Sequence, residues 1–148
     1  VVDLLLVPRF VFSLSCIERR IPLGSTARRH GHVLCNILLG SIPSDAKIPI
    51  VTAGRAASSQ WVREKYARLR PLENLKLEAR GWTLDVLNFV RGLGKAEFTL
   101  GEVYAQEAAL ARLHPDNLHV RDKIRQQLQR LRDLGFIEFA GRGHYRLT

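Results

Sequence analysis

The sequence predicts a mixed α/β module over residues 1–75, followed by an α+β module of helices and a C-terminal β-hairpin over residues 76–148. Apolar stretches without helical spacing dominate the first fifty residues, whereas helical spacing and helix-capping residues dominate after residue 80. Residues 71–80 between them have no strong pattern and are typical of a connector. With 46% hydrophobic residues, a chain of 148 residues can bury a core.

Three apolar segments of the first module are predicted to be strands of a partial sheet. Residues 1–12, VVDLLLVPRFVF, carry branched and aromatic side chains without helical spacing, which favours a strand buried inside the sheet. Residues 33–43 and residues 47–54 are expected to add two strands, joined through residues 41–45.

The segment between the first two strands, residues 16–32, is basic. Pro22 and Gly24 interrupt it, so we expect a loop there. Its exposed arginines are the first candidates for contacts with phosphate, above all Arg28 and Arg29, together with Arg19 and Arg20.

A helix is predicted over residues 58–70. Ser58 is a suitable N-cap, and Pro71 is expected to end the helix. One face is expected to carry Trp61, Val62, Lys65, Tyr66 and Leu69, so Trp61 is interpreted as a core anchor, as is Trp82 in the next module.

The second module is predicted to begin with a helix over residues 83–93. Thr83 is the expected N-cap, Trp82 is expected to pack on Leu87, and Gly92 and Gly94 are expected to end the helix.

A second helix is predicted over residues 99–113. Thr99 and Glu102 have the spacing of a capping box, and Phe98 is placed to pack on Val103. A third helix is predicted over residues 118–134, with Asp116 or Asn117 as its cap.

This third helix is strongly basic and amphipathic. Apolar side chains recur at steps of three and four and predict a buried stripe made by Val120, Ile124, Leu128 and Leu131. The opposite side carries groups that donate to phosphate oxygens or to base edges: Arg121, Lys123, Arg125, Gln126, Gln129, Arg130 and Arg132.

A β-hairpin is predicted after this helix, which Gly135 is expected to end. Residues 136–140 and 144–147 are the expected strands, and Arg142 stands between two glycines at the tip. Helix, helix, basic helix and hairpin is the order of a winged helix, which presents one helix to the major groove of DNA. We therefore predict an autonomous winged helix over residues 81–148 that binds double-stranded DNA, with His144 and Arg146 as further contacts.

The charge distribution supports two separate DNA-facing surfaces. The chain has a net charge of +9. Residues 1–70 contain eleven Lys and Arg against four acids, and residues 119–148 contain seven against three, whereas residues 71–118 contain five against seven. Clustered cations favour a polyanionic partner through counterion release.

Other chemistry has little support in the sequence. Cys16 and Cys35 lack metal-ligand spacing, and His30, His32 and His114 have no partners at such spacing, so no metal site is predicted. Ser13, Ser15 and Cys16 have no recognisable base and acid, so no catalytic residue is predicted. No apolar run is long enough for a membrane helix, and the two lone cysteines favour a reduced, cytoplasmic setting. A monomer is expected. The apolar start at Val1 favours a chain that begins within a domain.

Several segments together resemble the methyl-directed type II restriction endonucleases of the DpnI and Dam-replacing family. In the second module these segments are GWTLDVLNFV, EFTLGEVY, KIRQQLQRLRD and FIEFAGRGHYR; in the first they are VPRFVF, IERRIPL, TARRHGH and CNILL. The resemblance implies that residues 1–75 are the later part of a PD-(D/E)xK nuclease-like domain. It further implies cleavage of GATC with a methylated adenine, and that each module reads the modified site.

Three departures from the family pattern stand out. The family's catalytic Asp and Glu-x-Lys, which hold Mg²⁺ in the full-length enzyme, and its zinc site are expected upstream of Val1. Asp3, Glu18 and Arg20 imitate the catalytic pattern, but arginine is a poor substitute for the lysine. His32 stands where the family has a tryptophan that senses the methyl group, which leaves the methyl selectivity of this module open.

A winged-helix transcriptional regulator with an α/β sensor domain is the alternative interpretation. The arginines of TARRHGH favour the nuclease family, because a sensor domain needs no second phosphate-binding surface.

Overall fold

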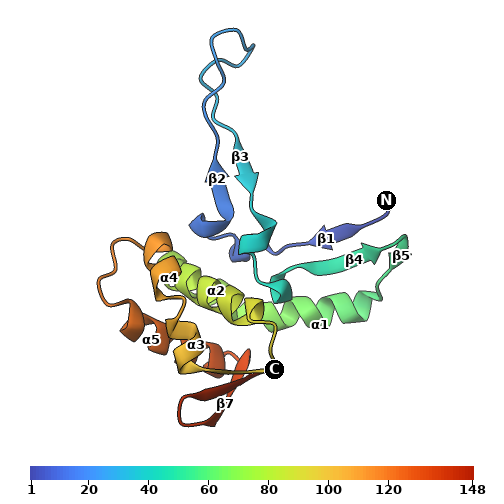
Figure 1. Cartoon of the computed structure of the whole chain (residues 1–148). Coiled ribbons are helices and arrows are strands. Elements are labelled where there is room, and N and C mark those ends of the chain that lie inside the picture. Colours follow the sequence, from blue (N-terminus) through green and yellow to red (C-terminus); the bar gives the residue numbers. More distant parts are fainter.

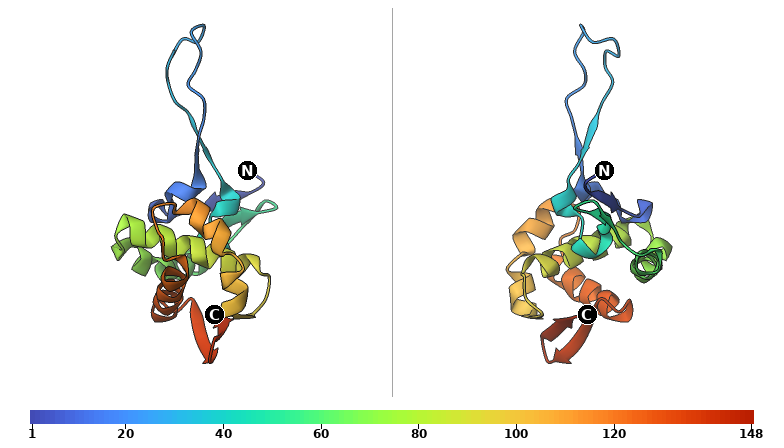
Figure 2. Two further views of the ribbon diagram at one scale, coloured as in Figure 1. Left: turned by 60° about the vertical axis from the view of Figure 1, so that its left-hand side comes forward. Right: turned by 90° about the vertical axis from the view of Figure 1, so that its right-hand side faces the viewer.

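The computed structural model describes residues 1–148 and places two small N-terminal sheets and one α-helix beside a helical unit with its own sheet (Figure 1). One of the N-terminal sheets is a hairpin of β2 (Ile17–Arg19) and β3 (Cys35–Ile37). Residues 17–37, which we call the arm, project away from the rest of the chain (Figures 1 and 2). None of the helices is both long enough and apolar enough to cross a membrane.

The other N-terminal sheet has the strand order β1-β4-β5 and is antiparallel. Its strands are β1 (Leu4–Leu6), β4 (Ile48–Thr52) and β5 (Arg55–Ala56). The prediction of one sheet from three strands was therefore wrong, because β3 pairs with β2 and β1 pairs with β4. Strand pairing depends on contacts between distant residues, which local patterns do not specify.

The first twelve residues also differ from the predicted buried strand. β1 is three residues long, and Leu4 and Leu5 are 48% and 46% exposed. After Pro8, which has no backbone N–H for a strand ladder, the chain enters a 3₁₀ turn at Arg9–Val11. Phe10 and Val11, in that turn, are the residues that reach the core.

Three further 3₁₀ turns, Leu14–Cys16, Leu39–Ser41 and Ser44–Ala46, connect these strands. Helix α1 (Ser59–Leu69) follows as predicted, and the Ser58 hydroxyl caps it by accepting the Trp61 backbone N–H at 3.2 Å. A 3₁₀ turn at Arg70–Asn74, with Pro71 near its start, then leads into the second unit.

The helical unit has a winged helix-turn-helix order and includes one strand that was not predicted. Its elements are α2 (Leu77–Gly92), β6 (Glu97–Thr99), α3 (Leu100–Tyr104), α4 (Glu107–Leu113), α5 (Val120–Asp133), β7 (Ile137–Gly141) and β8 (His144–Leu147). The predicted basic helix and hairpin are both confirmed. Strand β6 was not predicted; it pairs with β8, so the sheet has the order β6-β8-β7.

The first helix of this unit was predicted to start too late. α2 begins at Leu77, so Thr83 is not an N-cap but a buried residue within the helix. Its hydroxyl donates to the Ala79 carbonyl at 2.7 Å and lies 2.8 Å from the Gln127 side-chain oxygen. Trp82 cannot act as an N-terminal staple either, because it lies inside α2; its ring stacks on the His114 ring at 3.9 Å.

Of the two remaining predicted helices, the N-terminal cap of the first is confirmed, but its length and the cap of the second are not. The capping box of Thr99 and Glu102 is confirmed in both directions. The single helix predicted over residues 99–113 is wrong, since α3 ends at Tyr104 and α4 begins at Glu107. The N-cap of α5 is His119 without a side-chain hydrogen bond, and Asn117 instead accepts the His119 backbone N–H at 2.9 Å.

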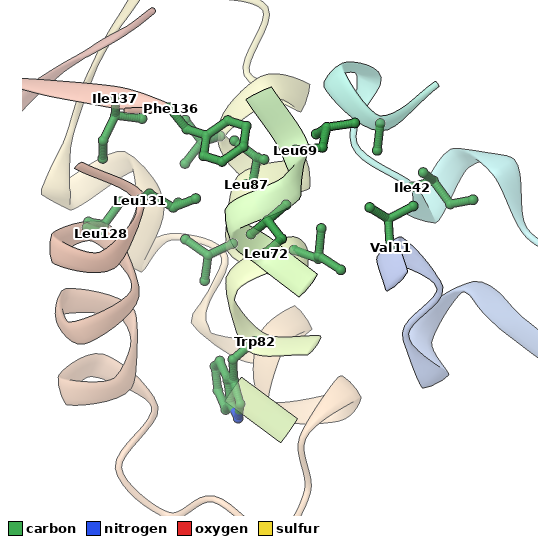
Figure 3. Close-up of a cluster of buried hydrophobic side chains, with 14 of the residues drawn as sticks. Val11, Ile42, Leu69, Leu72, Trp82, Leu87, Leu128, Leu131, Phe136 and Ile137 are labelled. Atoms are coloured by element: carbon green, nitrogen blue, oxygen red, sulfur yellow. The ribbon is translucent and has the colours of Figure 1, made fainter. Parts of the chain in front are cut away.

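One hydrophobic core runs through both parts of the chain. In Figure 3, Leu87 of α2 lies between two groups of buried side chains. Val11, Ile42, Leu69 and Leu72 come from the N-terminal part, and Leu128, Leu131, Phe136 and Ile137 come from α5 and β7. The orientation of α5 is thus fixed by packing that extends beyond the winged-helix unit.

Candidate nucleic-acid interface

Helix α5 has one buried face and one basic face. Val120, Ile124, Leu128 and Leu131 are at most 7% exposed, as the spacing predicts. Arg121, Arg125, Gln126, Gln129 and Arg132 are exposed on the remaining surface. The helix therefore presents guanidinium and amide groups to the solvent, and these groups can reach phosphates or base edges in a major groove.

Two of these exposed side chains make no hydrogen bond within the protein. The Arg125 guanidinium lies 5.7 Å from the centre of the Tyr104 ring, and Gln129 is exposed. Neither has an intramolecular hydrogen-bond partner to lose on binding DNA. The polar groups of Arg125 and Gln129 are consequently available to a ligand without breaking any internal hydrogen bond.

Arg121 is held by a neighbouring helix. Its Nε donates to a Glu107 carboxylate oxygen of α4 at 2.7 Å, and its guanidinium lies 5.1 Å from the Tyr104 ring. The hydrogen bond to Glu107 raises the pKa of Arg121 above its usual value. Only Nε is engaged, so the terminal nitrogens can still donate to a phosphate, but the Glu107 carboxylate fixes the guanidinium and offsets part of its charge.

Lys123 and Arg130 are half-buried rather than fully exposed. The Lys123 ammonium lies 6.0 Å from the Trp82 ring, and Arg130 donates to the side-chain oxygen of Gln127 at 3.1 Å. Gln127 is fully buried and also lies 2.8 Å from the Thr83 hydroxyl. The Gln126 side chain accepts a hydrogen bond from Gln127 at 3.3 Å. This network holds Arg130 and Gln126 at the edge of the basic face.

Sequence reasoning did not identify Gln127 as a positioning residue. Its spacing contained the signal, because it lies three residues after Ile124 and four before Leu131 and so faces the core. A buried amide at such a place is expected to be hydrogen-bonded, as it is.

The wing carries one exposed arginine at its tip. Arg142 lies between Gly141 and Gly143, whose φ angles of 146° and 71° suit glycine, and its side chain makes no hydrogen bond. His144 is exposed at the start of β8. Arg146 donates to a Glu97 oxygen at 3.0 and 2.7 Å, which raises the pKa of Arg146. Arg142 is therefore the free cation of the wing.

Three aromatic residues near these cations were also not identified from the sequence. Tyr104 is contacted by Arg121 and Arg125, and its hydroxyl is buried without a partner. Tyr145 stacks on Phe98, and burial raises the pKa of Tyr145. Phe139 is 57% exposed on β7. Local sequence gives no clear signal for such a cluster, because its members come from α3, β7 and β8.

Arg28 and Arg29 are exposed on the arm. The arm and the wing lie at opposite ends of the molecule in all three views (Figures 1 and 2). The structure therefore separates these arginines from the α5 and wing residues, as the division of charge along the sequence indicates.

One expectation about serine and histidine needs correction. Ser15 Oγ donates to Asp85 at 2.5 Å, and the other Asp85 oxygen lies 2.8 Å from His114 Nε2. An acid and a histidine are thus near Ser15, contrary to the sequence interpretation. Both residues bond to Asp85 rather than to each other, so His114 cannot take a proton from Ser15 directly. The group instead joins the N-terminal part to α2 and α4.

The residues that imitate the catalytic pattern are not brought together. Asp3 precedes β1 and accepts the Ala53 backbone N–H, whereas Glu18 lies on β2 and accepts a hydrogen bond from Asn36. These strands belong to different sheets. No three His, Cys, Asp or Glu side chains gather in a group that could hold a metal ion.

Comparison with protein families covers nearly the whole chain. Residues 1–75 match the Dam-replacing family, and residues 78–147 match the Dam-replacing helix-turn-helix domain. The second match contains α5 and the wing, so the basic surface described above belongs to a DNA-binding domain. The chain is a member of the Dam-replacing, DpnI-like family and carries that family's helix-turn-helix domain.

Proposed function

We propose that this chain binds double-stranded GATC DNA with methylated adenine, as the recognition part of a type II restriction endonuclease. The observation that carries the proposal is the pair of unbonded side chains, Arg125 and Gln129, on the exposed face of α5 in a helix-turn-helix domain of this family. Arginine forks onto guanine and glutamine onto adenine in the major groove, and GATC contains both bases.

The wing supports the same orientation on DNA. Arg142 extends from a two-glycine tip and is not tied to a carboxylate, so it is suited to a phosphate beside the groove. Arg121 and Arg146 are ion-paired, and we assign them a supporting role.

We propose the arm as a second DNA-binding surface, with Arg28 and Arg29 as phosphate contacts. Its projection from the chain suits insertion along a groove. His32 occupies the position of the family's methyl-sensing tryptophan, so we assign methyl selectivity mainly to the winged helix. The family membership and the basic arm favour this function over that of a transcriptional regulator.

The residues present do not fit the family's magnesium centre. Asp3 and Glu18 lie on different sheets with partners of their own, and Arg20 stands in place of the lysine. We therefore derive no catalytic step for residues 1–148 and propose that they recognise DNA as a monomer. Cleavage by restriction enzymes of this family is expected to require Mg²⁺, and residues 1–148 gather no group of ligands that could hold it.

Fluorescence anisotropy with labelled duplexes tests the proposal. Four duplexes are compared at one salt concentration: GATC methylated on both strands, on one strand, on neither, and a scrambled site. The methylated site should bind at least roughly tenfold more tightly than the scrambled site, since each lost base contact costs about 1–3 kcal/mol. Equal affinities for GATC and the scrambled site would contradict sequence-specific recognition. Equal affinities for the methylated and unmethylated GATC sites would contradict methyl selectivity but would leave recognition of the GATC sequence standing.

A further inference from the structure

A basic cavity of about 500 Å³ lies between α1, the segment at residues 44–49, the end of α2 and Thr148. None of its lining residues belongs to α5 or to the wing tip. Its charged residues are Lys47, Lys65, Arg68, Arg91 and Asp45, so four cations face one carboxylate. A cavity of this size can hold a small ligand, and the excess of positive charge favours an anion.

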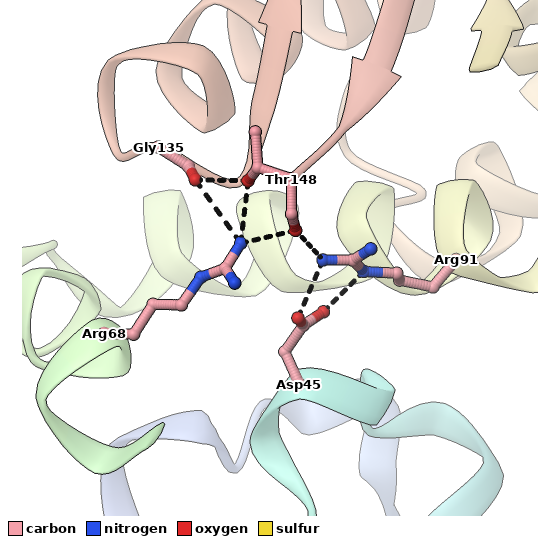
Figure 4. A network of polar contacts seen from close by, with 5 residues as sticks. All are labelled: Asp45, Arg68, Arg91, Gly135 and Thr148. Carbon is pink, nitrogen blue, oxygen red and sulfur yellow. Dashed lines mark hydrogen bonds and ion pairs between the residues drawn. The ribbon is translucent and has the colours of Figure 1, made fainter. Parts of the chain in front are cut away.

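Two of the cations already converge on an oxygen atom. Arg68 and Arg91 both donate to the Thr148 backbone oxygen, at 2.6 and 3.1 Å (Figure 4). Asp45 fixes the Arg91 guanidinium with hydrogen bonds of 2.6 and 2.8 Å, and the two side chains are only 19% and 14% exposed. The guanidinium groups are therefore held in position before any ligand arrives.

Further donors in the cavity remain unused. All hydrogen bonds of Arg68 come from Nη2, and Figure 4 shows its other terminal nitrogen pointing away from Thr148. Lys47 donates only to the Leu39 backbone oxygen, at 3.0 Å, and Lys65 makes no hydrogen bond. The Asp45 side chain is engaged by Arg91, so the remaining donors of Lys47, Lys65 and Arg68 are available to an oxyanion.

The cavity also has an aromatic wall. Trp61 and Pro49 line it and separate it from a neighbouring hollow that contains Arg55. Trp61 is half-buried, and the Lys65 ammonium lies 5.5 Å from its ring. A flat indole next to lysine donors suits a ligand that carries both a nucleobase and a phosphate.

We propose that this cavity binds the phosphate group of a nucleotide unit. Arg68, Lys47 and Lys65 donate to the phosphate oxygens, Asp45 and Arg91 keep the site in place, and Trp61 packs against the base. The nucleotide is either free or part of a nucleic-acid strand, and both sources present the same chemistry. This site is separate from α5 and the wing and goes beyond the duplex recognition proposed above.

Isothermal titration calorimetry at constant ionic strength tests the site with dAMP, inorganic phosphate and adenosine. We expect dAMP to bind, phosphate to compete with it, and adenosine to bind at least roughly tenfold more weakly, since it lacks the charge-assisted hydrogen bonds. Binding of dAMP should also change the tryptophan fluorescence, because Trp61 lines the cavity. The change can be assigned to Trp61, since Trp82, the other tryptophan, is only 1% exposed and lies outside the cavity. Adenosine binding as tightly as dAMP would overturn the proposal.

Two variants of the same helix separate a specific site from general attraction. Lys65→Gln removes an exposed, unbonded cation of the cavity and should weaken dAMP roughly three- to tenfold. Arg63→Gln removes an equal charge from α1 but lines a different cavity, so it should leave dAMP binding unchanged. Equal losses in both variants would refute the site.

The source of the nucleotide follows from comparing dTMP with a short oligo-dT strand. Equal affinity per site indicates a free nucleotide, whereas much tighter binding of the strand indicates nucleic acid; both outcomes support a phosphate site. Duplex binding by Lys65→Gln, measured in parallel, should match the parent chain. The nucleotide result therefore stands or fails independently of GATC recognition.

Discussion

Alanine at Arg125 or Gln129 is expected to lower the affinity for GATC while leaving the affinity for a scrambled duplex nearly unchanged. Both side chains are exposed and make no hydrogen bond within the protein. Their removal should therefore affect folding little; Arg125 loses only its contact with the Tyr104 ring, which contributes about 0.5–1 kcal/mol at an exposed site.

The magnitude follows from the kind of contact. A bidentate side-chain contact to the correct base contributes about 1–3 kcal/mol of discrimination, which corresponds to roughly 5- to 150-fold in Kd. Arg142 on the wing should behave differently, because a phosphate is present in every sequence. Arg142→Ala should weaken both duplexes about equally and reduce the slope of log K against log salt by about 0.9.

The assay is a salt titration of the GATC and scrambled duplexes with each variant, read by fluorescence anisotropy. Arg121→Ala is a matched comparison on the same helix, and its loss should be smaller because Glu107 already holds that guanidinium at 2.7 Å. Equal losses on both duplexes for Arg125→Ala and Gln129→Ala would refute base reading. They would show that α5 only grips the DNA backbone.

Three other outcomes are expected. Asp85→Ala should lower the free energy of unfolding by about 2–4 kcal/mol in chemical denaturation, because it leaves Ser15 and His114 without their buried partner. Asp122→Ala, at an exposed position, is the control. An equal loss of stability in both variants would contradict a structural role of Asp85. Hydrogen bonds from Lys95 and Thr99 lower the pKa of Glu102 from 4.5 to about 2, so its capping contribution should be complete above pH 4.5 and disappear as the pH falls through about 2. The Tm difference between Glu102→Gln and the parent chain should narrow over that range, and a constant difference would count against the cap. With Mg²⁺, gel assays should show no cleavage of GATC by residues 1–148; cutting abolished by Glu18→Ala would reverse that interpretation.

Elements set by local signals were predictable from the sequence. The Ser58 cap, the Thr99–Glu102 capping box and the stop at Gly135 each act within a few residues, and the structure confirms all three. The apolar stripe of α5 placed that helix within two residues at each end. The basic face of α5 could be predicted at the same time, because it is the side of the helix opposite the apolar stripe.

Elements set by distant contacts were not predictable. α2 begins six residues before Thr83 without a side-chain cap, because buried packing along its length holds it rather than a terminal signal. Strand β6 is only three residues long and is defined by its pairing with β8. The single sheet predicted for the N-terminal part failed for the same reason, since pairing partners are chosen in three dimensions.

The same distinction decides which arginines of α5 are free to bind DNA. From the sequence, Arg121 and Arg125 are equivalent, since they lie four residues apart on one face of a helix. In the structure both approach the Tyr104 ring, but only Arg121 reaches Glu107, a residue of α4. Tertiary packing thus makes Arg121 part of the scaffold and leaves Arg125 with unsatisfied donors. Which arginines of α5 are available for the proposed contacts with bases therefore depends on Glu107 of a neighbouring helix as well as on α5 itself.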